Sequence, residues 1–167
     1  MEYTGKIMTS RGHVFQFNGQ GTHFLSIAIV AELSLLAVQF IIGMWMNLFA
    51  VYPSYNNAFP MYGMMDIMFS IPELMVHMMI GVLIGLLSLM IFMMTLMLGD
   101  YKSMVVSAIA SISILLAGLS GLEFIFSNFQ NNTFSFTMSI GFIIAVISFV
   151  FLLYSISIES KAAHLHS

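Results

Sequence analysis

The sequence contains little charge and no cysteine. Of its 167 residues, 7% are Asp, Glu, Lys or Arg, and none is Cys. A soluble domain carries roughly a quarter charged residues, so this class of protein is excluded. Without cysteine there can be no disulfide and no iron–sulfur cluster. The three prolines all lie between residues 53 and 72, which leaves the rest of the chain free of helix breakers of that kind.

Apolar residues make up 60% of the chain and are concentrated in four long runs. A helix needs about 20 apolar residues to cross a bilayer, and each run is that long. The runs are apolar at nearly every position, whereas the strands of a membrane barrel alternate in polarity. We therefore predict an all-α protein, a four-helix transmembrane bundle running up-down-up-down. The expected spans are 24–50, 72–98, 104–127 and 136–157.

The basic residues indicate how the bundle is oriented. The predicted domain covers 24–157, with polar tails at 1–23 and 158–167. The basic residues all fall in the tails or in the second connection: Lys6, Arg11, Lys102 and Lys161. Because basic residues mark the cytoplasmic side, we expect both termini in the cytoplasm and the protein to be multi-pass in the plasma membrane.

The connections expected outside are 51–71 and 128–135. The second of them contains Asn131 in an Asn-Asn-Thr triplet, a glycosylation acceptor sequence that an exported loop could use.

Two helix starts carry capping residues. Thr22 is a candidate N-cap for the first span. Ser70 and Glu73 flank Pro72 in the pattern of a capping box, in which each side chain accepts a hydrogen bond from the backbone N–H of the other residue. This pattern gives Glu73 a structural role.

Small residues predict where the helices approach closely, because lipid offers no hydrophobic drive for their association. In the second span, His77, Gly81, Gly85 and Ser88 share one helix face, and Gly81 and Gly85 form a GxxxG motif. In the third span, small residues recur every four positions. We expect these two faces to make the tight contact inside the bundle. The second face comprises Ser113, Ala117 and Gly121.

The first span carries a polar stripe that should face protein, formed by Glu32, Gln39, Gly43 and Asn47. Glu32 is expected about 12 Å inside the membrane, where an ionised carboxylate is costly unless it is paired. Two interpretations stay open for Glu32: a proton relay or quinone contact, and a hydrogen bond to a neighbouring helix. Gln39 is expected to make a hydrogen bond to a neighbouring helix.

Asn47, His77 and Glu123 are expected at similar depth near the outer surface. One interpretation is a cluster that exchanges protons with the outside or sits beside a cofactor or quinol headgroup. The other is a hydrogen-bonded polar layer. The 17 methionines lie in runs that face several directions, so lipid contact and packing account for them, and we predict no metal site and no catalytic residue.

Haem between two histidines of one chain is not expected. His77 lies near the outer surface, while His23 begins the first span at the cytoplasmic face and the other histidines are in the tails. A haem on His77 would need Met44, Met138 or a residue of a partner chain as its second ligand.

The segments GMWMNLFAVYP and VHMMIGVLIGLLSL, with Gly118, Gly121 and Phe124 later on, resemble a loosely defined set of small four-helix membrane proteins of archaea and bacteria. More distantly, PELMVHMMIG is similar to one half of haem A synthase or a cytochrome b-type bundle. That resemblance implies a haem ligand at His77. The relatives have Glu and His three apart with Arg following, whereas Glu73 and His77 are four apart and Met78 follows.

Three functions are compatible with this sequence. The first is a small accessory subunit of a larger prokaryotic membrane complex, with a respiratory assembly of the terminal or quinol oxidase type as the expected class. The second is a haem-binding or quinone-reactive electron carrier using His77. The third is a small channel, transporter component or self-assembling membrane protein. The expected partners are the lipid bilayer and other membrane subunits, not nucleic acid.

Overall fold

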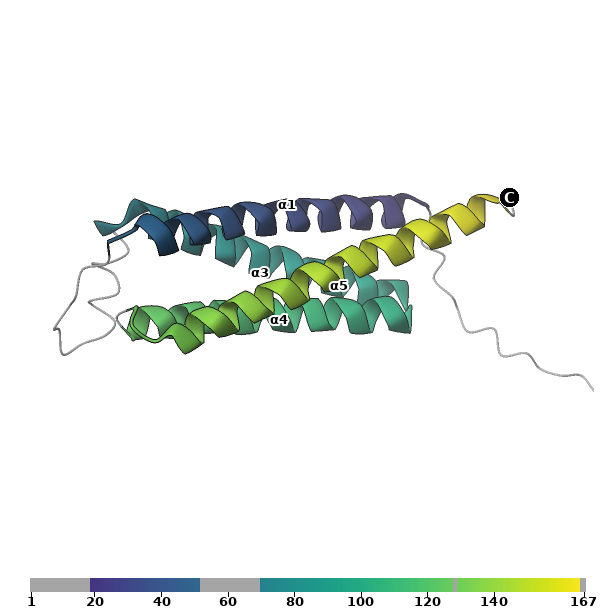
Figure 1. The fold of residues 1–167 in the computed structure, drawn as a ribbon. Coiled ribbons are helices and arrows are strands. Elements are labelled where there is room, and N and C mark those ends of the chain that lie inside the picture. The colour runs from purple at the N-terminus through teal and green to yellow at the C-terminus, as the bar shows by residue number, and fades with distance from the viewer. Residues whose placement is uncertain (1–18, 52–69, 128, 166–167) are drawn as a thin grey trace, which may run out of the picture.

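A computed structural model describes residues 19–51, 70–127 and 129–165. These residues form four long helices, which confirms the predicted all-α bundle (Figure 1). Each helix contains a segment long and apolar enough to span a membrane. The helices are α1 Gly19–Phe49, α3 Pro72–Leu98, α4 Tyr101–Phe126 and α5 Asn132–Leu165.

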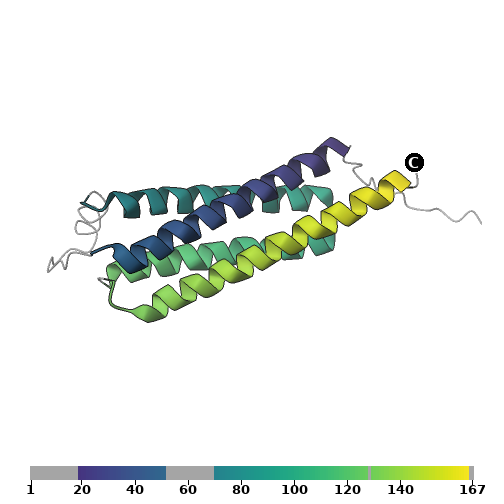
Figure 2. The ribbon, with the colours of Figure 1, turned by 45° about the horizontal axis from the view of Figure 1, so that its top comes forward.

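The helices run alternately in opposite directions and form a ring in which α1 contacts α3 and α5, and α4 contacts α3 and α5. The most extensive contact is between α4 and α5. Figures 1 and 2 show that α5 lies beside α4 where it begins and approaches α1 where it ends. We call the end of the bundle that carries the α3–α4 connection the turn end, and the opposite end, which carries the α4–α5 connection, the loop end.

The first and last helices of the chain, α1 and α5, extend beyond the spans that were predicted from the apolar runs. Helix α1 begins at Gly19 rather than near residue 24, so Thr22 lies inside the helix and not at its N-cap. Helix α5 continues to Leu165, although the span was predicted to end at 157. The residues after 157 contain no glycine or proline, and a polar sequence of this kind ends the apolar run without ending the helix.

Helix α3 begins one residue later than the predicted capping box requires. Its N-cap is Ile71, whose side chain can make no capping hydrogen bond, and Pro72 occupies the first turn. The carbonyl of Ile71 accepts hydrogen bonds from Leu74 N at 3.0 Å and Met75 N at 3.3 Å. The prediction of Ser70 as N-cap is therefore wrong, and Glu73 is not the partner in a capping box.

The connection between α3 and α4 is a tight turn made by two residues. Gly99 adopts φ 71°, the left-handed conformation that glycine favours, and its N–H donates to Leu96 O at 3.2 Å. Asp100 is the N-cap of α4, and its carboxylate accepts from Ser103 N at 2.8 Å and from Lys102 N at 3.4 Å. The turn keeps α3 and α4 together at this end of the bundle.

Two groups of buried apolar residues hold the four helices together. The larger group includes Leu25 of α1, Ile91 of α3, Ala110 of α4 and Phe149 of α5, and so joins all four helices. The smaller group lies toward the loop end and contains Met46, Ile71, Leu74 and Ile125.

The small-residue faces of α3 and α4 pack, but not against each other. A Cβ at Gly81 would lie 3.3 Å from Gln39 Nε2 of α1. On α4, Ala117 and Gly121 meet α5: a Cβ at Gly141 would lie 3.1 Å from Ala117 Cβ, and one at Gly121 would lie 3.4 Å from Met138 Sδ.

The tightest of these approaches is one that was not predicted. A Cβ at Gly141 would lie only 2.8 Å from the carbonyl oxygen of Ser113. Gly85 has no atom of another residue within 4 Å of its Cβ position in the described part of the chain. The prediction that the faces of α3 and α4 make the tight contact is wrong, because α5 carries a glycine at the height of Ser113 and so approaches α4 more closely than α3 can.

Candidate functional site

The contacts between α1 and α3 set the register of the two helices. The ring of His77 lies against Gly43, with its Cε1 3.1 Å from where a Cβ would be, and Gln39 lies against Gly81. The two helices are antiparallel, so moving four residues back along α1, from Gly43 to Gln39, corresponds to moving four residues forward along α3, from His77 to Gly81. Counting seven residues further along both helices from the contact of Gln39 with Gly81 puts Glu32 of α1 at the height of Ser88 of α3.

Glu32 is completely buried, with 0% of its surface exposed. Neither of its carboxyl oxygens has a hydrogen-bond partner among the residues that the structure describes. Glu32 lies about 17 Å from the start of the candidate membrane span Gly21–Phe49, at 1.5 Å per residue, and so near the middle of that segment. A carboxyl group here is near the middle of the membrane, where the neutral, protonated form is tolerated far better than the ion.

Gln39 and His77 form the second polar group between α1 and α3. The amide of Gln39 donates from Nε2 to the backbone carbonyl of His77 at 3.0 Å. The prediction that Gln39 makes an interhelical hydrogen bond is confirmed. Gln39 Oε1 and His77 Nδ1 are buried and have no partner in the described residues, so this group has unused hydrogen-bonding capacity.

A row of buried hydroxyl side chains runs along the contact between α3 and α4. Thr95 Oγ1 and Ser107 Oγ lie 2.6 Å apart, and Ser111 Oγ donates to Ser88 O at 3.1 Å. We call this row the hydroxyl seam. It consists of Ser88, Thr95, Ser103, Ser107 and Ser111, all of them buried.

The hydroxyl seam reaches from the turn end to the height of Glu32. Ser103 begins it beside the Asp100 cap, and Ser111 ends it against Ser88, which is level with Glu32. Of these five residues, only Ser88 was predicted to lie at a helix contact. The signal that could have revealed the rest was the recurrence of serine at 103, 107 and 111, a four-residue spacing that places all three on one helix face.

Asp100 provides a charged group where the seam meets the end of the bundle. Hydrogen bonds from the side chain and backbone of Ser103 hold the pKa of the Asp100 carboxyl below its usual value. The nearby charge of Lys102 acts in the same direction. Asp100 is therefore ionised at neutral pH, while the seam behind it is neutral.

The predicted cluster of Asn47, His77 and Glu123 does not form a buried group. Asn47 and Glu123 are exposed on the surface of the bundle, whereas the ring of His77 is turned inward against Gly43. The inward positions at this height belong to Met46 of α1 and Ile125 of α4, which join the smaller apolar core. Because Met46 and Ile125 face the core, Asn47 and Glu123, which lie one and two residues away on the same helices, face outward.

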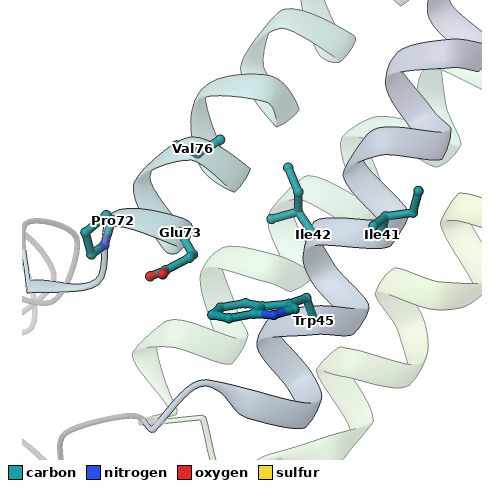
Figure 3. Close-up of a pocket in the computed structure, with 6 residues that line it drawn as sticks. All are labelled: Ile41, Ile42, Trp45, Pro72, Glu73 and Val76. Carbon is teal, nitrogen blue, oxygen red and sulfur yellow. The ribbon is translucent and has the colours of Figure 1, made fainter.

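An open groove lies between α1 and α3 near the loop end (Figure 3). It encloses about 330 Å³, and Trp45 and Glu73 extend into it from the two helices. Apart from Glu73 its lining is apolar: Ile41, Ile42, Trp45, Pro72 and Val76. This lining suits an apolar chain, and the Glu73 carboxylate is the one group in it that can carry charge.

Among the side chains that the structure describes, no two histidines are placed to bind one haem. His77 of α3 lies at the height of Gly43 of α1. His23 is also on α1 but 20 residues before Gly43, about 30 Å along the helix. Met138 packs its sulfur against Gly121, and Met44 is exposed. The described residues contain no group of three or more His, Asp or Glu that could hold a metal ion.

Asn131 is exposed beside the start of α5, and its side-chain oxygen accepts from Thr133 N at 3.1 Å. The first predicted outer loop lies almost wholly outside the described residues. The chain matches no protein family, no curated protein and no solved structure.

Proposed function

We propose that the protein is a small accessory subunit of a larger membrane complex, and that this complex is a respiratory electron-transfer assembly of the terminal or quinol oxidase type. The observation that carries the proposal is Glu32. A carboxyl group buried in the middle of the span, with no partner for either oxygen in the described chain, can take up and release a proton but contributes no hydrogen bond to the fold. Respiratory assemblies need such groups because they couple electron transfer to proton uptake.

The residues that the structure describes supply no ligand set for a redox centre. His77 is not accompanied by a second histidine at its depth, and no group of three acidic or histidine side chains is present in the described ranges. The electron-transfer step in this proposal therefore belongs to a partner subunit.

A feature on the surface of α4 is evidence for a contact with a helix of another subunit. Gly118 is exposed on α4, and a Cβ there would meet no atom of the described chain within 4 Å. Glycine in a span is favoured where another helix packs closely, so a glycine without such a neighbour in its own chain supports a contact with another subunit.

Native electrophoresis after mild detergent extraction from the producing membrane tests the proposal. We expect the protein to migrate in a large hetero-complex with redox-active subunits, and Gly118→Leu to release it. Ala37→Leu is the matched control, because it also enlarges an exposed small residue but on α1. Migration only as a homo-oligomer would refute the proposal and favour a channel or self-assembling membrane protein.

A further inference from the structure

We propose that the hydroxyl seam is the route by which protons reach Glu32, and that they come from the turn end of the bundle. This inference rests on the part of the proposed function that gives Glu32 a proton to carry. It does not depend on which complex the protein joins.

The seam has the position that such a route requires. Ser103, Ser107 and Ser111 follow one another at single turns of α4, so their hydroxyls rise along one face from the Asp100 cap to the middle of the span. Thr95 and Ser88 of α3 line the same contact from the other side. The register of α1 and α3 places Glu32 level with Ser88, where the seam ends.

The hydrogen bond between Thr95 and Ser107 has the chemistry that a relay needs. Either hydroxyl can be its donor. Each also has a second acceptor in its own helix, Phe92 O at 2.7 Å from Thr95 Oγ1 and Met104 O at 3.0 Å from Ser107 Oγ. The bond can therefore reverse its direction when both hydroxyls rotate, with no movement of the backbone.

The proton balance is closed along this route. When a seam hydroxyl oxygen accepts a proton from one side, it releases its own proton to the oxygen on the other side, directly between Thr95 and Ser107 and through a water molecule at the other steps, including the last one to Glu32. Glu32 exchanges one proton and keeps its neutral form at the end of the step. No oxidant or second reactant takes part.

The loop end offers no equivalent series in the described residues. The next polar side chain on the inward stripe of α1 is Gln39, about 10 Å beyond Glu32 along the helix. Between them Leu36 of α1 and Ile84 of α3 are buried in the larger apolar core.

No described charged group competes with this assignment. Counting along α5 from the stacked rings of Phe40 and Phe142, the residue near the height of Glu32 is the buried Phe149. The charged side chains of α3 and α4 that the structure describes lie near the helix ends: Glu73, Lys102 and Glu123.

The experiment follows hydrogen–deuterium exchange at Glu32 itself. The full-length protein in lipid vesicles is transferred to D₂O, and the carbonyl stretching band of the protonated carboxyl is recorded over time by infrared spectroscopy. Loss of the band in Glu32→Gln assigns it. Exchange of the backbone amides, recorded in the same spectra, reports whether each variant is folded.

We expect Thr95→Val combined with Ser107→Ala to slow the exchange of Glu32 by about tenfold, the factor that corresponds to losing one hydrogen bond from the route. Ser113→Ala is the matched control and should exchange as the wild type does, because Ser113 is buried on α4 where that helix packs against Gly141. Thr95→Ser, made in the chain that keeps Ser107, retains both hydroxyls of this bond and should exchange as fast as the wild type.

Equal rates in the double variant and in Ser113→Ala would overturn the inference. So would slowing by His77→Phe without slowing by the double variant, because the protons would then come from the loop end. If native electrophoresis shows no hetero-complex while the double variant still slows exchange, the proposed complex fails and the route stands.

Discussion

At the scale of single residues, we expect the buried carboxyl group of Glu32 to reduce the stability of the fold. Its buried oxygens lack partners in the described chain, and burying a polar group without a hydrogen bond costs about 1 to 3 kcal/mol. We predict that Glu32→Leu raises the free energy of unfolding by an amount in that range, measured by reversible unfolding in mixed micelles. A lower stability in this variant would show that the carboxyl group holds the helices together.

Gln39→Leu is the informative comparison for this prediction. It also removes a polar side chain from the inward stripe of α1, but it breaks the hydrogen bond to His77 O. Interhelical hydrogen bonds in membranes are worth about 0.6 kcal/mol on average, so we expect no gain in stability from this change.

The residues of the site could be predicted from the sequence only where they differ in polarity from their surroundings. Glu32, Gln39 and His77 are conspicuous in apolar runs, and all three lie inside the bundle. Buried and exposed serines have similar sequence surroundings. Ser34 on the surface and Ser107 in the seam both donate to a carbonyl of their own helix, and only the neighbouring helix distinguishes them.

At the scale of helices, the contact of α4 with α5 depends on one glycine. A methyl group at Gly141 would lie 2.8 Å from the backbone oxygen of Ser113, and a backbone atom cannot move aside as a side chain can. We predict that Gly141→Ala lowers the free energy of unfolding by about 1 to 3 kcal/mol, as overpacking does.

Gly118→Ala is the matched control for Gly141→Ala. Its new methyl group would meet no described atom within 4 Å, and alanine favours the helix over glycine by about 1 kcal/mol. We therefore expect it to leave stability unchanged or to raise it. Equal losses at the two positions would contradict the role assigned to Gly141.

The cap at Asp100 makes the stability of α4 depend on pH. Hydrogen bonds from Ser103 lower the pKa of Asp100 in the folded chain, so the folded state binds this proton less tightly than the unfolded state does. The stabilisation is complete above about pH 4, the ordinary range for aspartate, and is lost as the pH falls through the lowered pKa.

Two variants check the pH dependence at Asp100. Asp100→Asn keeps a capping side chain and should remove this part of the pH dependence of the Tm. Asp100→Ala should lower stability by about 1 kcal/mol at neutral pH because it removes the cap. A Tm difference between wild type and Asp100→Asn that does not change between about pH 6 and pH 3 would contradict the assignment.

The existence of the helices could be predicted because a span is a property of a continuous apolar run. The prediction of 72–98 coincides with α3, since Pro72 and Gly99 limit both the run and the helix. Hydropathy does not determine where α5 ends, because helix propensity continues past the last apolar residue. Which helices pack against each other depends on the sequences of both partners. The contact at Gly141 was not predicted because only the small residues of α3 and α4 were compared.

At the scale of the whole molecule, the two ends of the bundle carry different sets of polar residues. The hydroxyl seam and the Asp100 cap occupy the turn end, and Gln39, His77 and the groove at Trp45 occupy the loop end. Glu32 lies between them. On the proposed route, the side of the membrane from which protons reach Glu32 therefore depends on which end faces the cytoplasm.

The orientation can be measured cleanly because the chain contains no cysteine. Tyr101 at the turn end and Gln130 at the loop end are both exposed and uncharged, so replacing either by cysteine leaves the basic residues in place. The positive-inside rule predicts that a membrane-impermeant thiol reagent labels Gln130→Cys in intact cells and labels Tyr101→Cys only after permeabilisation. The reverse pattern would place the turn end outside, and the seam would then deliver protons to Glu32 from the exterior.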